Sequence, residues 1–159
     1  MVDEVCLNDA LLAGAKEVFE TMIFMDIEES SEPDRQVECD ALLGSITFKG
    51  NLEGCLTICC GVLCAKTIAV NMLGMDSGEE LSKEETHDAI GEVTNMVMGS
   101  VKSRVQDSVS DLEVSIPSVV SGRGLDSSLG DGTTRILVKV GIEDEYIAEL
   151  SLLYRENSR

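Results

Sequence analysis

The sequence predicts an α+β fold in which long helices pack on an antiparallel sheet. Two long segments, residues 5–25 and 81–104, carry apolar residues at helical spacing. Two pairs of β-prone segments are each joined by a turn containing glycine, which indicates β-hairpins. Helices and strands do not alternate as βαβ units, so a doubly wound parallel sheet is not expected.

The composition is that of one globular domain spanning residues 1–159. A chain of this length buries about two-thirds of its unfolded surface. Aromatic residues are only 3% of the total and Trp is absent, so the core must be aliphatic and rich in Met. The net charge of −18 disfavours nucleic acid and anionic lipid as partners, and it favours a partner with exposed Lys or Arg.

Nothing in the sequence indicates a membrane segment. No apolar run reaches the roughly 18 residues that a spanning helix needs. The N-terminal residues include early acids and lack a basic region followed by an apolar one, so no signal peptide is expected. We therefore expect a cytoplasmic protein with no membrane insertion and with its six cysteines reduced.

The first half is predicted to contain a helix, a loop, a hairpin and a second helix. In order, these are a helix at 5–25, an acidic loop at 26–35, strands at 43–49 and 55–60 around a turn at 50–54, and a helix at 62–73. Pro33 marks the loop because proline interrupts regular structure. Gly74 follows the last apolar residue of the second helix and is typical of a helix end.

The second half is predicted to contain a long helix, one strand and another hairpin. In order, these are a lead-in at 77–80, the helix at 81–104, a strand at 113–121, a loop at 122–132, strands at 133–140 and 146–154, and a polar tail at 155–159. Ser82 and Glu85 have the spacing of a capping box. Pro117 cannot donate a ladder hydrogen bond, so we expect an edge or a bulge there.

The two halves resemble each other, since each has a helix followed by a hairpin. Aligning Glu17 with Glu92 places Glu20 where Asn95 stands. This similarity indicates a degenerate internal two-fold repeat in which only the second copy keeps a Glu-x-x-Asn pair.

The long helix has two contrasting faces. Its apolar stripe is roughly 140° wide, and it consists of Ala89, Ile90, Val93, Met96, Val97 and Val101. The polar stripe lies nearly opposite and consists of Asp88, Glu92, Asn95, Gly99 and Lys102. One face is suited to burial, and the other presents a carboxylate and a carboxamide about one turn apart. A helical Gly costs about 1 kcal/mol relative to Ala, and close approach of another backbone would explain Gly99.

Other reactive residues are expected to be structural. Cys59 and Cys60 lie on a predicted core strand, where Cys packs as a small hydrophobic residue. No CxxC pair occurs, and the single histidine, His87, is expected to face solvent, so no metal site is predicted. A Cys-based or metal enzyme is therefore the weakest interpretation. The glycine-rich loop at 122–132 has no following helix to form a phosphate site.

Two stretches of the second half have a more specific pattern. The first is Asp88-Ala-Ile-Gly-Glu92-Val-Thr-Asn95-Met96, and the second is Ser115-Ile-Pro117-Ser-Val-Val-Ser-Gly122. A Glu-x-x-Asn tetrapeptide alone arises by chance roughly once in a few hundred positions, so the combination matters. Together they resemble the CheC/CheX/FliY family of bacterial chemotaxis phosphatases.

The resemblance covers most of the chain, from about Asn8 to Leu153, and is closest to the CheX branch. Glu20 stands where CheC proteins carry a first Asn, so one site per chain is implied. The chain has no room for the additional flagellar-switch segments of FliY.

This resemblance implies hydrolysis of the aspartyl phosphate of a CheY-type response regulator, which ends the chemotaxis signal. Glu92 would engage an active-site Lys of the regulator, and Asn95 would orient the attacking water. Asp88 and Gly99 would contact the partner, although Asp88 is equally typical of a solvated helix face.

The resemblance also implies a homodimer formed through sheet edges. The chain would bind no cofactor itself, because Mg²⁺ is expected on the regulator. The alternative function is a non-catalytic adaptor that binds a chemotaxis or flagellar-switch protein without turnover.

Overall fold

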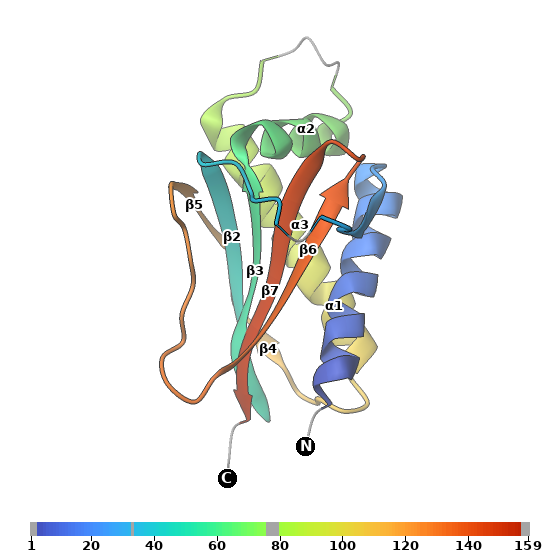
Figure 1. Cartoon of the computed structure of the whole chain (residues 1–159). Coiled ribbons are helices and arrows are strands. Elements are labelled where there is room, and N and C mark those ends of the chain that lie inside the picture. The colour runs from blue at the N-terminus through green and yellow to red at the C-terminus, as the bar shows by residue number, and fades with distance from the viewer. Residues whose placement is uncertain (1–2, 33, 76–79, 157–159) are drawn as a thin grey trace.

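A computed structural model describes residues 3–32, 34–75 and 80–156, and in these ranges three α-helices pack on a seven-stranded antiparallel sheet (Figure 1). The helices are α1 (Glu4–Val18), α2 (Val62–Leu73) and α3 (Lys83–Val105), and a π-helical turn, η1 (Phe19–Ile23), follows α1. The strands are β1 (Ile27–Glu29), β2 (Ala41–Lys49), β3 (Leu52–Gly61), β4 (Glu113–Val114), β5 (Ser118–Gly122), β6 (Thr134–Ile142) and β7 (Tyr146–Glu156). The expected α+β architecture is confirmed.

The helices form a layer on one face of the sheet. α1 and α3 lie side by side on that face, and α2 crosses one end of it (Figure 1). The connection between β1 and β2 crosses the opposite face, where Arg35 Nη2 donates to the carbonyl oxygen of Glu145 at 2.7 Å and Lys139 Nζ donates to that of Arg35 at 3.1 Å. The long loop between β5 and β6 also runs along this side (Figure 1).

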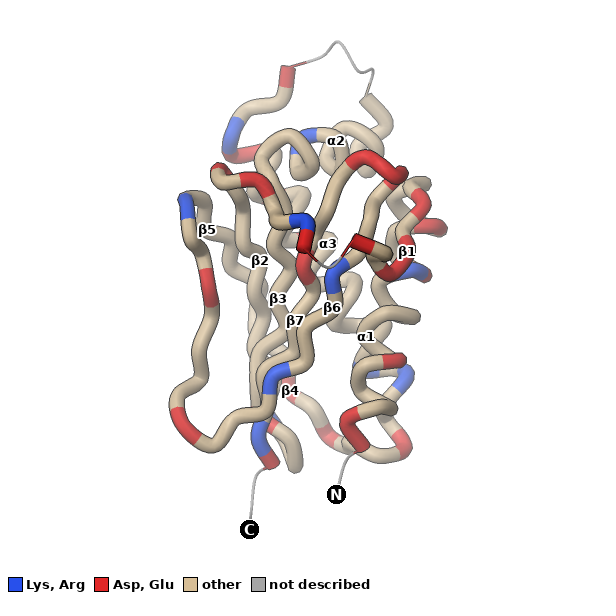
Figure 2. The backbone as a smooth tube through the Cα atoms, in the orientation of Figure 1, with Lys and Arg blue, Asp and Glu red and all other residues tan. Residues whose placement is uncertain are grey.

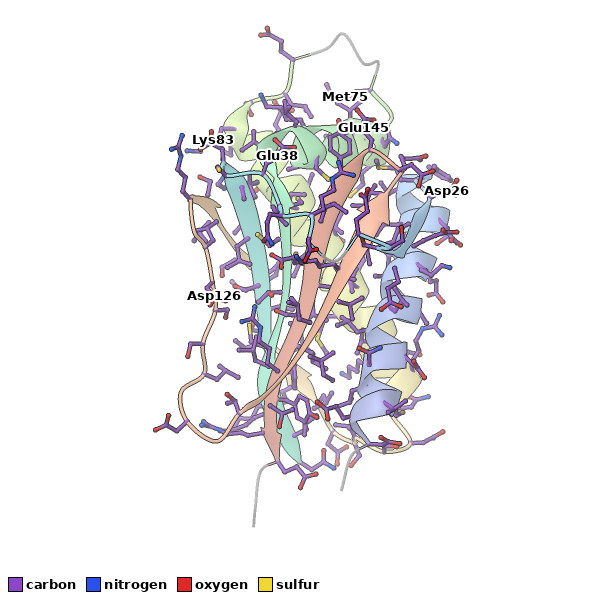
Figure 3. The ribbon with its side chains drawn as sticks, in the orientation of Figure 1. Asp26, Glu38, Met75, Lys83, Asp126 and Glu145 are labelled. Atoms are coloured by element: carbon purple, nitrogen blue, oxygen red, sulfur yellow. The ribbon has the colours of Figure 1, made fainter. Side chains whose placement is uncertain are left out.

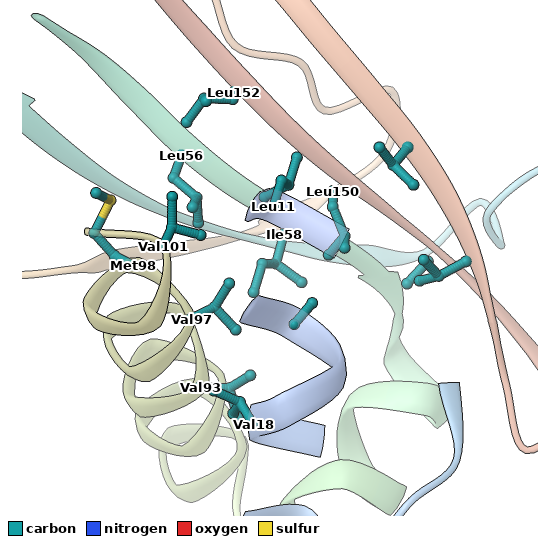
Figure 4. Packing of buried hydrophobic residues seen from close by; sticks show 14 of the residues in the cluster. Leu11, Val18, Leu56, Ile58, Val93, Val97, Met98, Val101, Leu150 and Leu152 are labelled. Carbon is teal, nitrogen blue, oxygen red and sulfur yellow. The ribbon is translucent and has the colours of Figure 1, made fainter. Parts of the chain in front are cut away.

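The main core fills the space between the helices and the sheet (Figure 4). Its buried side chains include Leu11 and Val18 from α1, Val93, Val97, Met98 and Val101 from α3, and Leu56, Ile58, Leu150 and Leu152 from β3 and β7. These residues are aliphatic or Met, as the composition predicts. Each large side chain stabilises the fold by about 1.5–3 kcal/mol through removal from water.

The strand order supports the expected internal repeat. The sheet runs β1-β6-β7-β3-β2, and β4 and β5 both pair with β2 at the far edge. Read with β5 at the far edge, the order is β1-β6-β7-β3-β2-β5. If β1 is exchanged with β5, β2 with β6 and β3 with β7, the same order results, read from the opposite edge of the sheet. α1 and α3 begin the two halves and pack against each other. The topology is that of a two-fold repeat even though few residues match.

Two expectations for the first half are wrong in detail. The helix predicted at 5–25 becomes π-helical at Phe19 and is ended by Phe24, which adopts a left-handed conformation with φ of 61°. The loop predicted at 26–35 contains β1, which pairs with β6. Ile27 of this strand is buried in the core with 1% of its surface exposed. The short helix at 62–73 is confirmed, and Gly74 ends it at φ of 66°.

The strand boundaries also differ from the predicted ones. The turn at 50–54 shortens to residues 50–51, because Leu52 is buried and begins β3. The strand at 113–121 is interrupted between β4 and β5, where Pro117 stands, as expected for an irregular edge. Residues 155–156 of the predicted tail belong to β7.

The predicted burial of α3 needs one correction. Met96 is only half-buried, whereas Met98 and Thr94 are buried at 1% and 0% exposure, so the buried face is wider than the apolar stripe. No described helix is long and apolar enough to cross a membrane. The expectations for Pro33, for the lead-in at 77–79 and for the tail at 157–159 lie outside the described residues.

Candidate functional site

The helix that carries the polar stripe is fixed at its start by a capping box. Ser82 Oγ accepts from the backbone N–H of Glu85 at 3.0 Å, and the Glu85 carboxylate accepts from the N–H of Ser82 at 3.2 Å. The predicted Ser-x-x-Glu cap is therefore confirmed. α3 continues for 23 residues, so Asp88 to Gly99 lie well inside it, away from fraying ends.

The polar stripe of α3 faces outward as predicted. Asp88, Glu92, Asn95 and Gly99 are all exposed, and the opposite side of the helix is buried in the core. Glu92 and Asn95 are three residues apart and therefore project from one surface. None of the three polar side chains forms a hydrogen bond or ion pair with another residue in the described ranges. They are thus available to a binding partner.

The orientation of this stripe is set by a close contact between α3 and β2. Thr94 is 0% exposed, and its hydroxyl donates to the carbonyl oxygen of Ile90 at 2.8 Å. Gly44 of β2 lies against Thr94, and a Cβ at Gly44 would overlap the Thr94 hydroxyl. The absence of a side chain at Gly44 therefore allows the helix to approach the sheet and fixes the direction of Glu92 and Asn95.

A second contact supports the same turn of the helix from the sheet edge. A Cβ at Gly91 would lie 3.5 Å from Val119 Cγ2 and 3.8 Å from Pro117 Cγ. The segment at 115–122 thus packs beside the turn that carries Glu92. The two sequence stretches that resemble the chemotaxis phosphatases are neighbours in space.

An exposed hydrophobic residue adjoins this contact, and sequence reasoning missed it. Ile116 immediately precedes Pro117 and is 88% exposed, and Val120 on β5 is 50% exposed. Ile in a β-prone segment is ordinarily read as core, so no local signal reveals the exposure. Ile116 and Val120 are thus exposed apolar side chains at the edge of the sheet that β5 forms.

Close approach of another backbone, the reason expected for glycine at position 99, is not found among the described residues. No described atom lies within 4 Å of the position that a Gly99 Cβ would take. Packing of the described chain therefore does not require glycine there. Because Gly99 has no side chain, the backbone of α3 is accessible on the exposed face one turn after Asn95.

The first-half counterpart of the stripe has a different backbone. Glu20, which aligns with Asn95, lies in the π-helical turn η1 rather than within an α-helix. Glu20 is exposed, but it is a carboxylate where the second half has an amide. Only α3 presents the Glu-x-x-Asn pair from a regular helix.

The cysteines are free thiols, and several pack in the interior as expected. Cys55, Cys60 and Cys64 are buried, and Cys59 is half-buried. Burial raises the pKa of Cys59 to about 11, with smaller contributions from Glu149 and Asp126. Thiols of this kind are protonated and weakly nucleophilic at neutral pH.

The expectation that His87 faces solvent is wrong. His87 is half-buried, and its Nε2 atom is inaccessible to solvent and has no hydrogen-bond partner among the described residues. In these residues no group of three His, Cys, Asp or Glu side chains is arranged to hold a metal ion. His87 also lines a cavity next to the start of α3.

Comparison with known proteins identifies the same family as the residues of the site. Residues 42–140 match the family model described as chemotaxis phosphatase CheX. No curated protein sequence matches the chain. The crystal structure of the chemotaxis protein CheX from Vibrio vulnificus is 26% identical, covers 94% of this chain and 96% of its own, and superposes with a TM-score of 0.76.

Two further structures are similar in fold. A putative chemotaxis protein from Desulfovibrio vulgaris Hildenborough is 19% identical over 98% of this chain and 100% of its own, with a TM-score of 0.79. A chain of the CheX–CheY–BeF₃–Mg²⁺ complex from Borrelia burgdorferi is 17% identical over 98% of this chain and 100% of its own, with a TM-score of 0.73.

Proposed function

This chain belongs to the CheX family of chemotaxis phosphatases, and on that premise we propose that it hydrolyses the aspartyl phosphate of a CheY-type response regulator. The observation that carries the proposal is the pair Glu92 and Asn95, exposed and unpaired on one surface of a capped helix. The CheX of Borrelia burgdorferi forms a complex with CheY, which supports a regulator as the partner.

Asn95 is the residue that we assign to the attacking water. Its side-chain carbonyl accepts a hydrogen bond from water, and its NH₂ donates to a neighbouring oxygen. The amide carries no charge that would repel the phosphoryl group. The water oxygen attacks phosphorus, the bond from phosphorus to the aspartyl oxygen breaks, and the electron pair returns to the regulator's carboxylate. The water proton passes to an oxygen of the phosphate that is released. This reaction depends on positioning and charge stabilisation more than on a strong base.

Glu92 is the residue that we assign to docking. A carboxylate next to the phosphoryl group would be repelled by it, so Glu92 is poorly suited to act as the base. An ion pair with a Lys of the regulator would instead fix the helix relative to the active site. Because α3 is already formed and its stripe is unpaired, docking requires no ordering of a loop.

Asp88 and Gly99 extend the docking surface along the helix. Asp88 lies one turn before Glu92 and is exposed. Gly99 lies one turn after Asn95, where the open backbone admits the surface of the regulator at close range. The net charge of −18 favours encounter with a basic surface, and this attraction weakens with salt.

In this proposal the metal belongs to the substrate. Mg²⁺ on the regulator's own carboxylates would neutralise charge on the phosphoryl group, and this chain would supply only α3 and its water. A cytoplasmic location is part of the proposal, and the six free thiols support it.

The proposal includes a homodimer formed through the sheet edge. β5 pairs only with β2 among the described strands, so its outer edge is open to a second copy. The exposed side chains of Ile116 and Val120 would be covered by such pairing.

The decisive experiment measures phosphate release from a phosphorylated CheY-type regulator with Mg²⁺. The wild-type chain should accelerate release, and Asn95→Ala should lower the turnover by about 100-fold while regulator binding persists. Full activity in Asn95→Ala would refute the assignment of that residue. Stoichiometric binding without acceleration by the wild type would refute the enzyme and support the adaptor.

A further inference from the structure

We propose that a cavity at the α2 end of the sheet binds a small organic anion with an apolar body. The cavity has a volume of about 490 Å³ and lies between β2, α2, the first turns of α3 and the end of β5. This volume is within the range of sites that hold small molecules in proteins. The cavity is separate from the Glu92–Asn95 pair, which does not line it, so this inference does not depend on the phosphatase proposal.

Two unpaired lysines give the cavity its preference for an anion. Lys66 of α2 and Lys83 of α3 both line it, and neither forms an ion pair with another described residue. Asp40 is the acidic residue in the lining, and Arg123 Nε neutralises it at 2.8 Å. Figure 3 shows Lys83 at this end of the molecule, and Figure 2 shows further basic segments on α2 and at the end of β5. The lining thus presents two lysines and one carboxylate that is already paired, in a chain whose net charge is −18.

His87 also lines the cavity, and its Nε2 atom has no hydrogen-bond partner among the described residues. Because that atom is closed to solvent in this structure, a ligand oxygen does not reach it, and the preference for an anion depends on the two lysines. The backbone of α2 adds to this preference, because α2 begins at the cavity with no acidic residue in its first turn and no side-chain cap.

The remaining wall is suited to an apolar group. Leu42 is only 3% exposed, and Leu42, Val62 and Leu81 line the cavity together. Apolar walls with a few convergent polar groups are characteristic of small-molecule sites. The acid group of the ligand would therefore lie toward Lys66 and Lys83, and its body would lie on the aliphatic side chains.

The first test compares two fluorescent probes that differ in one group. 8-Anilino-1-naphthalenesulfonate carries a sulfonate, and N-phenyl-1-naphthylamine is the same framework without it. Titrated into the folded full chain, the sulfonate should bind saturably with one equivalent and at least about tenfold more tightly than the neutral probe. Equal affinities, or binding that does not saturate, would overturn the proposal.

Variants then locate the bound probe. Lys66→Gln and Lys83→Gln should each weaken sulfonate binding by about fivefold or more and leave the neutral probe unaffected. Lys49→Gln is the matched control, because it removes the same charge from an exposed position at the other end of β2. Equal weakening by Lys49→Gln would show a general charge effect and refute the site. Unfolding curves of all three variants show whether the fold is intact.

Displacement of the sulfonate probe defines the acid group. Benzoate and phenyl phosphate present a carboxylate and a phosphate on the same ring, and benzyl alcohol presents neither. Displacement by one acid assigns that class, and displacement by both assigns organic anions in general. Displacement by neither, or by benzyl alcohol as effectively as by the acids, would overturn the proposal in favour of a hydrated cavity.

Discussion

The carboxylate of Glu17 in α1 lies 2.7 Å from the guanidinium of Arg104 in α3, and it also accepts a hydrogen bond from the Ser100 hydroxyl at 3.3 Å. Glu17 is the first-half counterpart of Glu92. In one copy of the repeat the glutamate is paired with this chain's own cation, and in the other it is unpaired. The pair lies at the surface and stabilises the fold by about 0–1 kcal/mol. Its main consequence is that the Glu17 carboxylate already has an ion-pair partner within this chain.

This difference predicts that the two glutamates are not equivalent. Glu92→Ala should raise the KM for the phosphorylated regulator by at least about tenfold, because the docking ion pair is lost. Glu17→Ala is the matched control and should leave the KM unchanged. Steady-state phosphate release measures both. A similar rise in KM for Glu17→Ala would mean that α1 also contacts the regulator.

Gly99 should be dispensable for stability but not for docking. Gly99→Ala should raise the free energy of unfolding by up to about 1 kcal/mol, because the helix gains propensity and the added methyl group meets no described atom. Gly99→Phe should keep the fold yet weaken regulator binding by roughly tenfold, through a clash at the docking surface. Denaturant unfolding measures the stability of Gly99→Ala, and titration with the regulator measures the binding of Gly99→Phe. Tight binding by Gly99→Phe would remove Gly99 from the interface.

Unlike Gly99, Gly44 should be required for stability, because Thr94 and Ile90 fill the space that a side chain at position 44 would take. Gly44→Ala places a methyl group against Thr94 and Ile90, and overpacking of this kind costs about 1–3 kcal/mol. In a Thr94→Ala background the same substitution should cost less, since the hydroxyl it meets is gone. A double-mutant cycle from unfolding curves measures this coupling. Strict additivity would show that the contact does not constrain α3.

The half-buried thiol of Cys59 should make stability sensitive to alkaline pH. Its folded pKa is raised from the ordinary 9.0 to about 11, first by burial and then by Glu149 and Asp126. The unfolded thiol ionises first, so this contribution is complete below pH 9.0 and disappears as pH rises toward 11. Peptide mapping after iodoacetamide treatment should show exposed Cys39 alkylated well before Cys59. Equal rates near pH 9.0 would contradict the shift.

The proposed homodimer should depend on salt and on the β5 edge. Two chains of charge −18 repel each other, so added salt should strengthen the dimer by screening. Ile116→Lys with Val120→Lys should yield monomers, because exposed apolar side chains are replaced by charges that oppose edge pairing. Sedimentation equilibrium at low and high salt gives the mass. A monomeric wild type at both salt concentrations would refute the dimer.

The elements of this fold could be predicted where the signal is local. The capping box at Ser82 and the helix end at Gly74 depend on residues a few positions apart, and both are confirmed. The outward face of α3 follows from helical periodicity, which requires no tertiary information. β1 was missed because three residues carry too little periodicity, and its partner strand lies more than 100 residues away.

By itself, the sequence determined that a regular helix presents Glu92 and Asn95 on a polar face, because side-chain direction follows from residue spacing. Only the tertiary structure decided that Glu17 forms an ion pair with Arg104, that Pro117 and Val119 pack against Gly91, and that His87 lines a cavity. These relationships join segments distant in sequence. Their contacts arise from the packing of helices on the sheet, and no local pattern encodes that packing.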